Sequence, residues 1–161
     1  MTMQEYITNA PVTVEQVQRK VMDFVEDRKD VVIIGSWAVN LQAQNEEQRQ
    51  TSDIDLTTMD KDLHILLIAY IFANLGIHLT IHSQYPDLIR LYSRGLNQDR
   101  PIVDIVYKSV DWEIKEGLRV ATIDWLIKAK KKAIASPLRA ETKRLVDQRD
   151  LLVLEAASKE D

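Results

Sequence analysis

Two aspartates, Asp53 and Asp55, lie two residues apart in a stretch of alternating polar and apolar residues, 53–57. This alternation predicts a β-strand, in which side chains two positions apart point to the same face. Two carboxylates on one face can hold a divalent cation such as Mg²⁺, which prefers oxygen ligands. A cation held there neutralises phosphate charge and keeps the attacking and leaving oxygens in line during phosphoryl transfer. Asp60 and Asp62 have the same spacing but lie at a predicted helix start, and about one such pair is expected by chance.

A third carboxylate, Asp104, lies within the predicted strand 101–107, with apolar residues on both sides of it. A lone carboxylate at such a position is costly unless it is paired, hydrogen-bonded or exposed at the end of a sheet. We therefore interpret Asp104 as a further ligand of the metal site, close to an acceptor hydroxyl whose proton it can take. The alternative is an edge-strand aspartate that faces water.

Gly35 and Ser36 stand between an apolar strand and a helix that begins near Ser36. Backbone N–H groups at such a turn, together with a hydroxyl, can bind phosphate oxygens. Arg90 and Arg94, near the third aspartate, are further candidates for phosphate contacts. The order of these features is a strand, a Gly-Ser turn, a helix, a polar loop, the Asp-x-Asp strand and a later strand with one aspartate.

Hydrophobic periodicity and turn residues predict the other elements. Residues 44–52 are polar and lack periodicity, so we expect a loop there that leads into the Asp-x-Asp strand. The middle of the chain is therefore mixed α and β, and its last part is helical, with a break at Ser136-Pro137. We expect helices over 14–28, from 36 onward, and over 60–74, 123–134 and 137–156. The expected strands are 31–34, 53–57, 77–82, 88–93, 101–107 and 118–121.

The composition is that of an ordinary globular protein. A chain of 161 residues, 45% hydrophobic and 29% charged, suffices for one domain or for one domain with a short extension. No apolar run reaches the roughly 20 residues that span a bilayer, and the first residues lack the pattern of a secretion signal. The chain has no cysteine, which excludes disulfides and thiolate metal sites. We expect a cytoplasmic protein without membrane contact.

The net charge of −4 is unevenly distributed along the chain. Residues 128–144 contain seven basic side chains and one acidic side chain, so this segment carries +6 and the remainder −10. Such a segment is typical either of a solvated helix face or of contact with a polyanion. Its basic residues are Lys128, Lys130, Lys131, Lys132, Arg139, Lys143 and Arg144.

These motifs, in this order, resemble the nucleotidyltransferase superfamily to which DNA polymerase β belongs. The matching segments are Ile33-Ile34-Gly35-Ser36-Trp37-Ala38, Ser52-Asp53-Ile54-Asp55-Leu56 and Val103-Asp104-Ile105. The resemblance implies an α/β (α+β) fold, in which a small mixed sheet is flanked by helices. It implies a catalytic core over residues 1–121 and a C-terminal helical extension over 122–161 that packs on this core. It also implies two Mg²⁺ ions on the three aspartates and a nucleoside triphosphate held at the Gly-Ser turn.

Within that superfamily, the form Arg49-x-Thr51-x-Asp-x-Asp-Leu and the helical tail resemble the abortive-infection toxins of the AbiEii-like group, including MenT-type toxins. The tail of these toxins carries a lysine and an acidic pair, which align here with Lys130 and with Asp147 and Asp150. The resemblance implies that all five residues belong to the nucleotide site. Lys130 would act in catalysis at the triphosphate, and Asp147 or Asp150 would hold that lysine in place.

The expected activity is the Mg²⁺-dependent transfer of a nucleoside monophosphate from a nucleoside triphosphate to an acceptor hydroxyl, with release of pyrophosphate. The toxin resemblance favours RNA as the acceptor, specifically the 3′ end of tRNA, and an antitoxin protein as a partner. The alternatives are an enzyme that modifies an antibiotic or a protein, and a non-catalytic module with a nucleotidyltransferase-like fold that binds and neutralises a partner.

Overall fold

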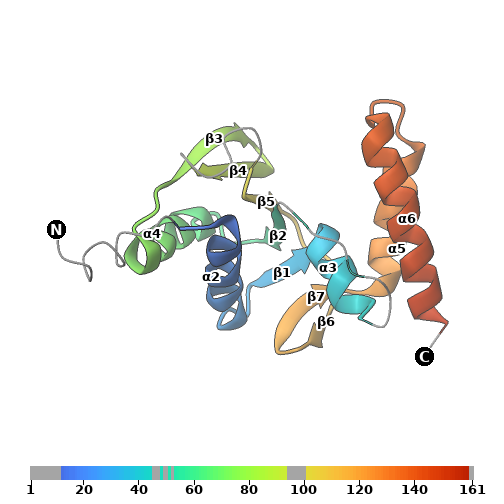
Figure 1. Ribbon diagram of the computed structural model, residues 1–161, viewed down its shortest axis with the longest axis horizontal. Helices are drawn as coiled ribbons and strands as arrows, with labels where there is room; N and C mark the ends of the chain where they lie inside the picture. Colours follow the sequence, from blue (N-terminus) through green and yellow to red (C-terminus); the bar gives the residue numbers. More distant parts are fainter. Residues whose placement is uncertain (1–11, 45–47, 49–50, 52, 94–100, 160–161) are drawn as a thin grey trace.

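The computed structural model describes residues 12–44, 48, 51, 53–93 and 101–159. Figure 1 shows the arrangement of its five helices and seven strands in this described part of the chain. The helices are α2 (Val14–Glu26), α3 (Gly35–Gln42), α4 (Leu63–Leu75), α5 (Ile123–Ala135) and α6 (Glu141–Ser158). The strands are β1 (Val31–Ile34), β2 (Ile54–Thr58), β3 (Leu79–Tyr85), β4 (Leu88–Ser93), β5 (Val103–Tyr107), β6 (Trp112–Lys115) and β7 (Leu118–Ala121).

The strands form one sheet in the order β3-β4-β5-β2-β1-β7-β6. β2 pairs parallel with β5, and β1 pairs parallel with β7, whereas the other neighbours are antiparallel. Helices α2 and α4 pack on each other, and α3 contacts β1, β2 and β7. The expected fold, a mixed sheet flanked by helices, is confirmed.

Alternation along the central strands separates the core from the face that bears the aspartates. Ile54 and Leu56 of β2 and Val103 and Ile105 of β5 are fully buried. Asp104, which alternates with the buried residues of β5, is only partly buried. The apolar residues on one face of each strand therefore anchor it, and the polar residues between them are left to the other face.

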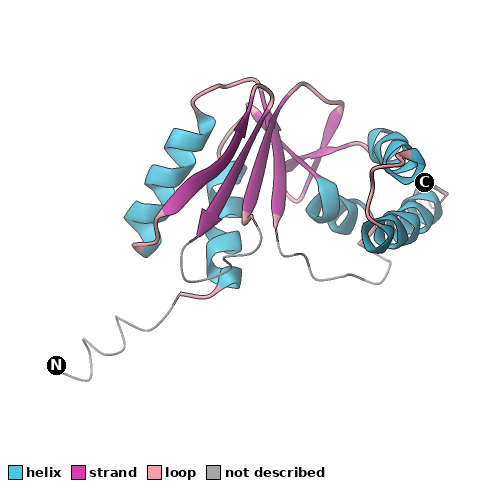
Figure 2. Cartoon of the chain, turned by 90° about the horizontal axis from the view of Figure 1, so that it is seen from above, coloured by secondary structure: helices cyan, strands magenta, loops and turns pink. Residues whose placement is uncertain are grey.

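The helical extension is a hairpin of α5 and α6 that lies to one side of the sheet, at the C-terminal end of the chain (Figures 1 and 2). α5 is preceded by the N-cap residue Thr122, whose hydroxyl accepts a hydrogen bond from the N–H of Trp125. The two helices pack on each other and on α3, with Leu126 and Leu154 in the core. The division of the chain into units at residues 121 and 122 stays a prediction.

The largest differences from the expected boundaries are in α4, β3 and α6. α4 begins at Leu63 rather than at residue 60, because the Asp60 carboxylate accepts a hydrogen bond from the N–H of Asp62 and closes a turn before the helix. β3 covers Leu79–Tyr85 rather than 77–82, and α6 begins at Glu141, beyond the break at Ser136-Pro137. The ends of elements depend on such local hydrogen bonds more than on periodicity.

One strand, β6, was not expected at all. It pairs with β7 through a tight turn in which Glu116 and Gly117 both have positive φ, 53° and 79°. These values are those of a two-residue hairpin turn. β6 is an edge strand of only four residues with little burial, and the alternation of Trp112 and Ile114 with Glu113 and Lys115 is too short to distinguish it from a loop. In the described part of the chain, no helix combines the length and apolar character needed to cross a membrane.

Candidate active site

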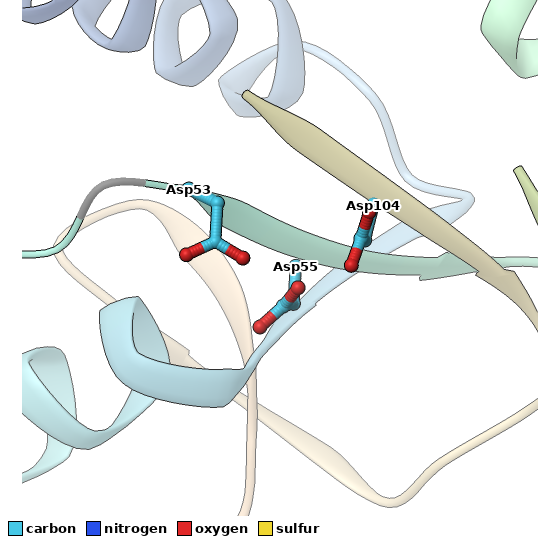
Figure 3. Close-up of side chains that lie close together, drawn as sticks. All are labelled: Asp53, Asp55 and Asp104. Atoms are coloured by element: carbon cyan, nitrogen blue, oxygen red, sulfur yellow. The ribbon is translucent and has the colours of Figure 1, made fainter. Parts of the chain in front are cut away.

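Asp53, Asp55 and Asp104 come together at one end of the two central strands (Figure 3). Each offers one carboxylate oxygen, and these three oxygens all lie within 4.8 Å of one another. Asp53 directly precedes β2, Asp55 is its second residue, and Asp104 is the second residue of β5. The structure thus brings together the three residues that the sequence singled out as metal ligands.

The strand register explains why they meet. Asp55 and Asp104 are direct partners in the parallel pairing of β2 with β5. On the other side of β2, Asp55 is paired with Ile34, the last residue of β1. Because partners in adjacent strands point to the same face of a sheet, both carboxylates stand in one row, next to the start of α3.

Gly35 closes the other side of the site. It follows β1 directly and begins α3 with a φ of +66°, a conformation that favours glycine. A Cβ atom at this position would overlap with the carboxylate of Asp55. Ser36 lies in the first turn of α3, so the helix start and its N–H groups face the region of the carboxylates.

Burial and neighbouring charges raise the pKa of two of the three carboxylates, Asp55 and Asp104. Burial raises the pKa of Asp55 to about 7, with further contributions from the charges of Asp53 and Asp104, against an ordinary value of 3.8. Burial likewise raises the pKa of Asp104 to about 6, although Arg90 acts in the opposite direction. The causes are loss of hydration and repulsion between like charges. A cation bound among the three would relieve both.

Arg90 contacts the third carboxylate from the neighbouring strand. It is the register partner of Asp104 in the antiparallel pairing of β4 with β5, and its Nε lies 3.5 Å from Asp104 Oδ1. Both atoms are buried, and neither has a hydrogen-bond partner among the described residues. Sequence reasoning placed Arg90 near the third aspartate, but only the register shows that the two residues are paired.

Lys130 is held in a buried ionic network between α5 and α6. Its Nζ lies 3.1 Å from Asp147 Oδ1 and 3.0 Å from Asp150 Oδ2, and both aspartates are almost completely buried. Arg139 also donates to both oxygens of Asp147, at 2.8 and 3.1 Å, and Arg149 pairs with Asp150 at 3.2 Å. The sequence predicted that these acids hold the lysine, and the structure shows them in contact with it.

The network lowers the pKa of Asp147, and its lysine also acts on Asp55. Burial alone raises the pKa of Asp147, but hydrogen bonds from Arg139 and Lys130 outweigh this effect, so the pKa lies below its ordinary value. The charge of Lys130 also lowers the pKa of Asp55, against the larger effects that raise it. Lys130 therefore stands within electrostatic reach of the carboxylate site.

The basic segment 128–144 is less basic at its surface than its composition suggests. Lys130 is paired with Asp147 and Asp150, Arg139 is paired with Asp147, and Arg144 pairs with Glu141 and donates to two backbone carbonyls. Arg139 was counted as part of a basic run, and no sequence signal marked it as a partner of Asp147. Among the described residues, four of the seven cations have no ion pair: Lys128, Lys131, Lys132 and Lys143.

The other two expected nucleotide-binding residues are Thr51 and Arg49. The carbonyl of Thr51 accepts a hydrogen bond of 2.8 Å from the amide of Gln18, which ties the segment before β2 to α2. Thr51 also lines a cavity of about 540 Å³ between α2 and α3. Arg49 and Arg94 lie outside the described residues. The roles assigned to Thr51 and Arg49 stay predictions.

The three carboxylates fit a hard divalent cation. They offer oxygen ligands at one point, and burial is the main cause that raises the pKa of Asp55 to about 7 and of Asp104 to about 6, so a bound cation would favour their charged forms. Asp104 Oδ1 is buried without a hydrogen bond, as expected of an oxygen whose partner is an ion. The ligands that would hold Mg²⁺ are therefore Asp53, Asp55 and Asp104.

No family model matches the sequence, and no curated protein matches it either. The structure is similar to solved structures. The Megavirus polyadenylate synthase is matched with a TM-score of 0.72 and 15% identity, over 90% of this chain and 31% of that one. JHP933 from Helicobacter pylori is matched with a TM-score of 0.60 and 21% identity, over 90% of this chain and 64% of that one. The lincosamide antibiotic adenylyltransferase LnuA, solved with lincomycin bound, is matched over 91% of this chain and 99% of that one, at 0.57 and 14%.

These similarities define the fold of the chain. It has the nucleotidyltransferase fold, which the polyadenylate synthase and the adenylyltransferase share at identities too low to carry more than the fold. The chain spans about a third of the polyadenylate synthase and less than two thirds of JHP933.

We predict that the metal-free protein loses stability as the pH rises from about 4 to about 7. In the unfolded chain Asp55 ionises near 3.8, whereas in the folded chain burial, Asp53 and Asp104 raise its pKa to about 7. Between these two pKa values, ionisation of Asp55 stabilises the unfolded chain relative to the folded one, so the free energy of unfolding falls. Above the folded pKa it no longer changes with pH. Since one pKa unit corresponds to about 1.4 kcal/mol, the loss is on the order of a few kcal/mol. Urea unfolding in the presence of a chelator, at a series of pH values, measures it.

Asp55→Asn is the reference for this measurement, because its amide does not ionise. The variant should become more stable relative to the wild type as the pH rises, and Mg²⁺ should stabilise only the wild type. A difference in unfolding free energy that stays constant with pH would contradict the prediction.

We also predict that Asp147→Ala destabilises the protein by about 3–5 kcal/mol, the range observed when one partner of a buried ion pair is removed. Lys130 and Arg139 would each lose a carboxylate in a largely buried setting. Because the pKa of Asp147 is lowered, its contribution should be present at neutral pH and lost as the pH falls below about 4. The control is Glu141→Ala, which removes an exposed ion pair and should change stability by less than about 1 kcal/mol. Equal effects of both substitutions would show that the network does not hold the hairpin.

Proposed function

We propose that this chain is a Mg²⁺-dependent nucleotidyltransferase. The observation that carries the proposal is the meeting of three carboxylates beside the Gly35 turn and the start of α3. Oxygen ligands for a divalent cation then lie next to N–H groups suited to phosphate, which is the combination that transfer from a triphosphate needs. Burial of three mutually repelling acids has no structural benefit in itself.

In the proposed reaction, the acceptor hydroxyl attacks the α-phosphorus of a nucleoside triphosphate. A new P–O bond forms, the bond between the α-phosphorus and the bridging oxygen breaks, and pyrophosphate leaves. Two Mg²⁺ ions on the aspartates, when bound, supply charge neutralisation and keep the reacting oxygens in line. Asp104 accepts the hydroxyl proton, and its pKa of about 6, raised by burial, suits a base at neutral pH.

The remaining site residues bind the triphosphate in this proposal. The Gly35-Ser36 turn receives phosphate oxygens at its N–H groups, and Lys130 meets the triphosphate as a point charge. Asp147 and Asp150 hold the lysine in position from behind. A lysine fixed by buried acids loses little further side-chain entropy when it binds a phosphate.

For the acceptor we propose RNA, specifically the 3′ end of tRNA, with a role as the toxin of a toxin–antitoxin pair. Support comes from the resemblance of the Arg49-x-Thr51 segment and of the tail to AbiEii-like toxins. It also comes from the lysines of the helical hairpin that no ion pair neutralises within the described chain: Lys128, Lys131, Lys132 and Lys143. Clustered cations on one element suit a polyanion.

We predict that Asp55→Asn abolishes nucleotidyl transfer while the protein stays folded, because the residue serves cation binding and not the core. Activity should fall by at least about 10³-fold, as is typical when a charge-stabilising group is removed from an active site. Transfer from labelled triphosphates in cell extract, combined with circular dichroism, tests this. Asp62→Asn is the matched control, since Asp62 is an exposed aspartate before α4. Wild-type turnover in Asp55→Asn would overturn the proposed site.

We further predict that the label enters RNA and that this transfer decreases steeply with salt, because contacts to phosphates release counterions. Each α-labelled triphosphate is incubated with extract and then with purified tRNA, and RNA, protein and small molecules are separated. Asp104→Asn serves as the inactive control. Label in an antibiotic or a protein, with none in RNA, would overturn the toxin proposal and leave the transferase chemistry standing. A chain that shows no Mg²⁺-dependent binding of triphosphate would be a non-catalytic module.

A further inference from the structure

Arg90 uses only part of its side chain in the ion pair with Asp104. Its Nε is buried against Asp104, yet 41% of its side chain is exposed. The exposed part must therefore be the outer part of the side chain, which includes the two terminal nitrogens of the guanidinium. Among the residues that the structure describes, the guanidinium makes no hydrogen bond and forms an ion pair with Asp104 alone.

The chemistry of these two nitrogens is specific. A guanidinium is always charged, and its planar fork of N–H donors matches two oxygens of one phosphate. Attraction to Asp104, whose side chain is 14% exposed, holds this fork next to the carboxylate triad before any ligand arrives. An arginine side chain that is already held in position loses less conformational entropy when it binds a phosphate than a mobile one does.

The order of the strands shows which ligand it would meet. Across the sheet, Arg90 lies on β4, Asp104 on β5, Asp55 on β2, and Gly35 follows β1. The elements assigned to the triphosphate, namely the Gly35 turn and α3, lie at the β1 end of this row. Arg90 stands at the opposite end, beyond the carboxylate that faces the acceptor hydroxyl in the proposed reaction.

We infer that Arg90 binds a backbone phosphate of the acceptor, so that the acceptor is the 3′ end of an RNA strand and not a cationic small molecule. This inference rests on the proposed function and names the substrate class of the same site. A phosphodiester next to the attacking hydroxyl would meet the outer nitrogens of the guanidinium. An acceptor rich in ammonium groups would instead meet a fixed positive charge beside Asp104.

The test measures binding and does not depend on turnover. A short single-stranded RNA with a free 3′ hydroxyl and a dye at its 5′ end is titrated with protein, and its fluorescence anisotropy gives Kd at several salt concentrations. We expect Arg90→Gln to raise Kd roughly tenfold. The slope of log Kd against log salt should fall by about 0.7, the value for one lost contact to a single strand. Arg90→Lys keeps the charge without the fork and should lie between the wild type and Arg90→Gln.

Two controls separate this role from general charge and from nucleotide binding. Lys20→Gln removes one positive charge from α2 and should leave Kd unchanged. Calorimetry with a non-hydrolysable triphosphate and Mg²⁺ should give the same affinity for the wild type and for Arg90→Gln. An unchanged Kd and salt slope in Arg90→Gln would overturn the inference, as would weaker binding of the triphosphate without weaker binding of RNA. If Arg90→Gln does not fold, the same measurements on Arg90→Lys decide the question.

The failure of this inference differs from the failure of the proposed function. RNA binding is repeated in Asp55→Asn, which should bind RNA without modifying it. Transfer retained in Asp55→Asn would refute the proposed active site, whatever Arg90 does. If transfer is lost in Asp55→Asn and the Kd for RNA is the same in Arg90→Gln as in the wild type, only the acceptor assignment is refuted.

Discussion

Repulsion between three carboxylates is the constraint on which the structure of the site depends. Parallel pairing of β2 with β5 places Asp55 beside Asp104, and Asp53 adds a third acid at the same end. Burial and repulsion by neighbouring acids disfavour the charged forms of Asp55 and Asp104, so the arrangement requires positive charge nearby. The chain supplies part of it from three elements, β4, α5 and α6, through Arg90, Lys130 and Lys143. The acidic end of the sheet and the cations around it therefore form one electrostatic unit.

The same requirement explains how the helical hairpin is built. Apolar residues such as Leu126 and Leu154 attach α5 and α6 to the core, but Lys130 is fixed by two buried aspartates. Replacing such a network with apolar residues is often neutral for stability or better, so stability is a weak reason for its presence. Its consequence is positional, because it determines where a lysine stands relative to Asp55. The hairpin thus holds one positive charge within electrostatic reach of Asp55.

The parts of this arrangement that depend on local patterns could be predicted from the sequence. The alternation around Asp55 and Asp104 gave two strands with their acids on one face, and the Gly35 turn followed from an apolar run that ends at glycine. The relation between strands could not be predicted, because register depends on contacts between residues far apart in the chain. The pairing of Arg90 with Asp104, and of Arg139 with Asp147, is of this kind. The edge strand β6 was not predicted because its alternation covers only four residues, Trp112–Lys115, and little of it is buried.

The fold alone leaves the acceptor open, since function resides in the site and not in the architecture. The nucleotidyltransferase fold is shared with a polyadenylate synthase and with a lincosamide antibiotic adenylyltransferase, two enzymes of different name and activity. In the proposed reaction, the side chains that distinguish one acceptor from another lie beyond the three carboxylates, on the side of Asp104 away from the Gly35 turn. In this chain that position holds a guanidinium, and the hairpin beside it carries lysines without ion pairs in the described structure. Two independent features are therefore both positively charged: the guanidinium held on the sheet and the group of lysines on the helical hairpin. Both favour an anionic acceptor, and a polynucleotide is long enough to contact the two together.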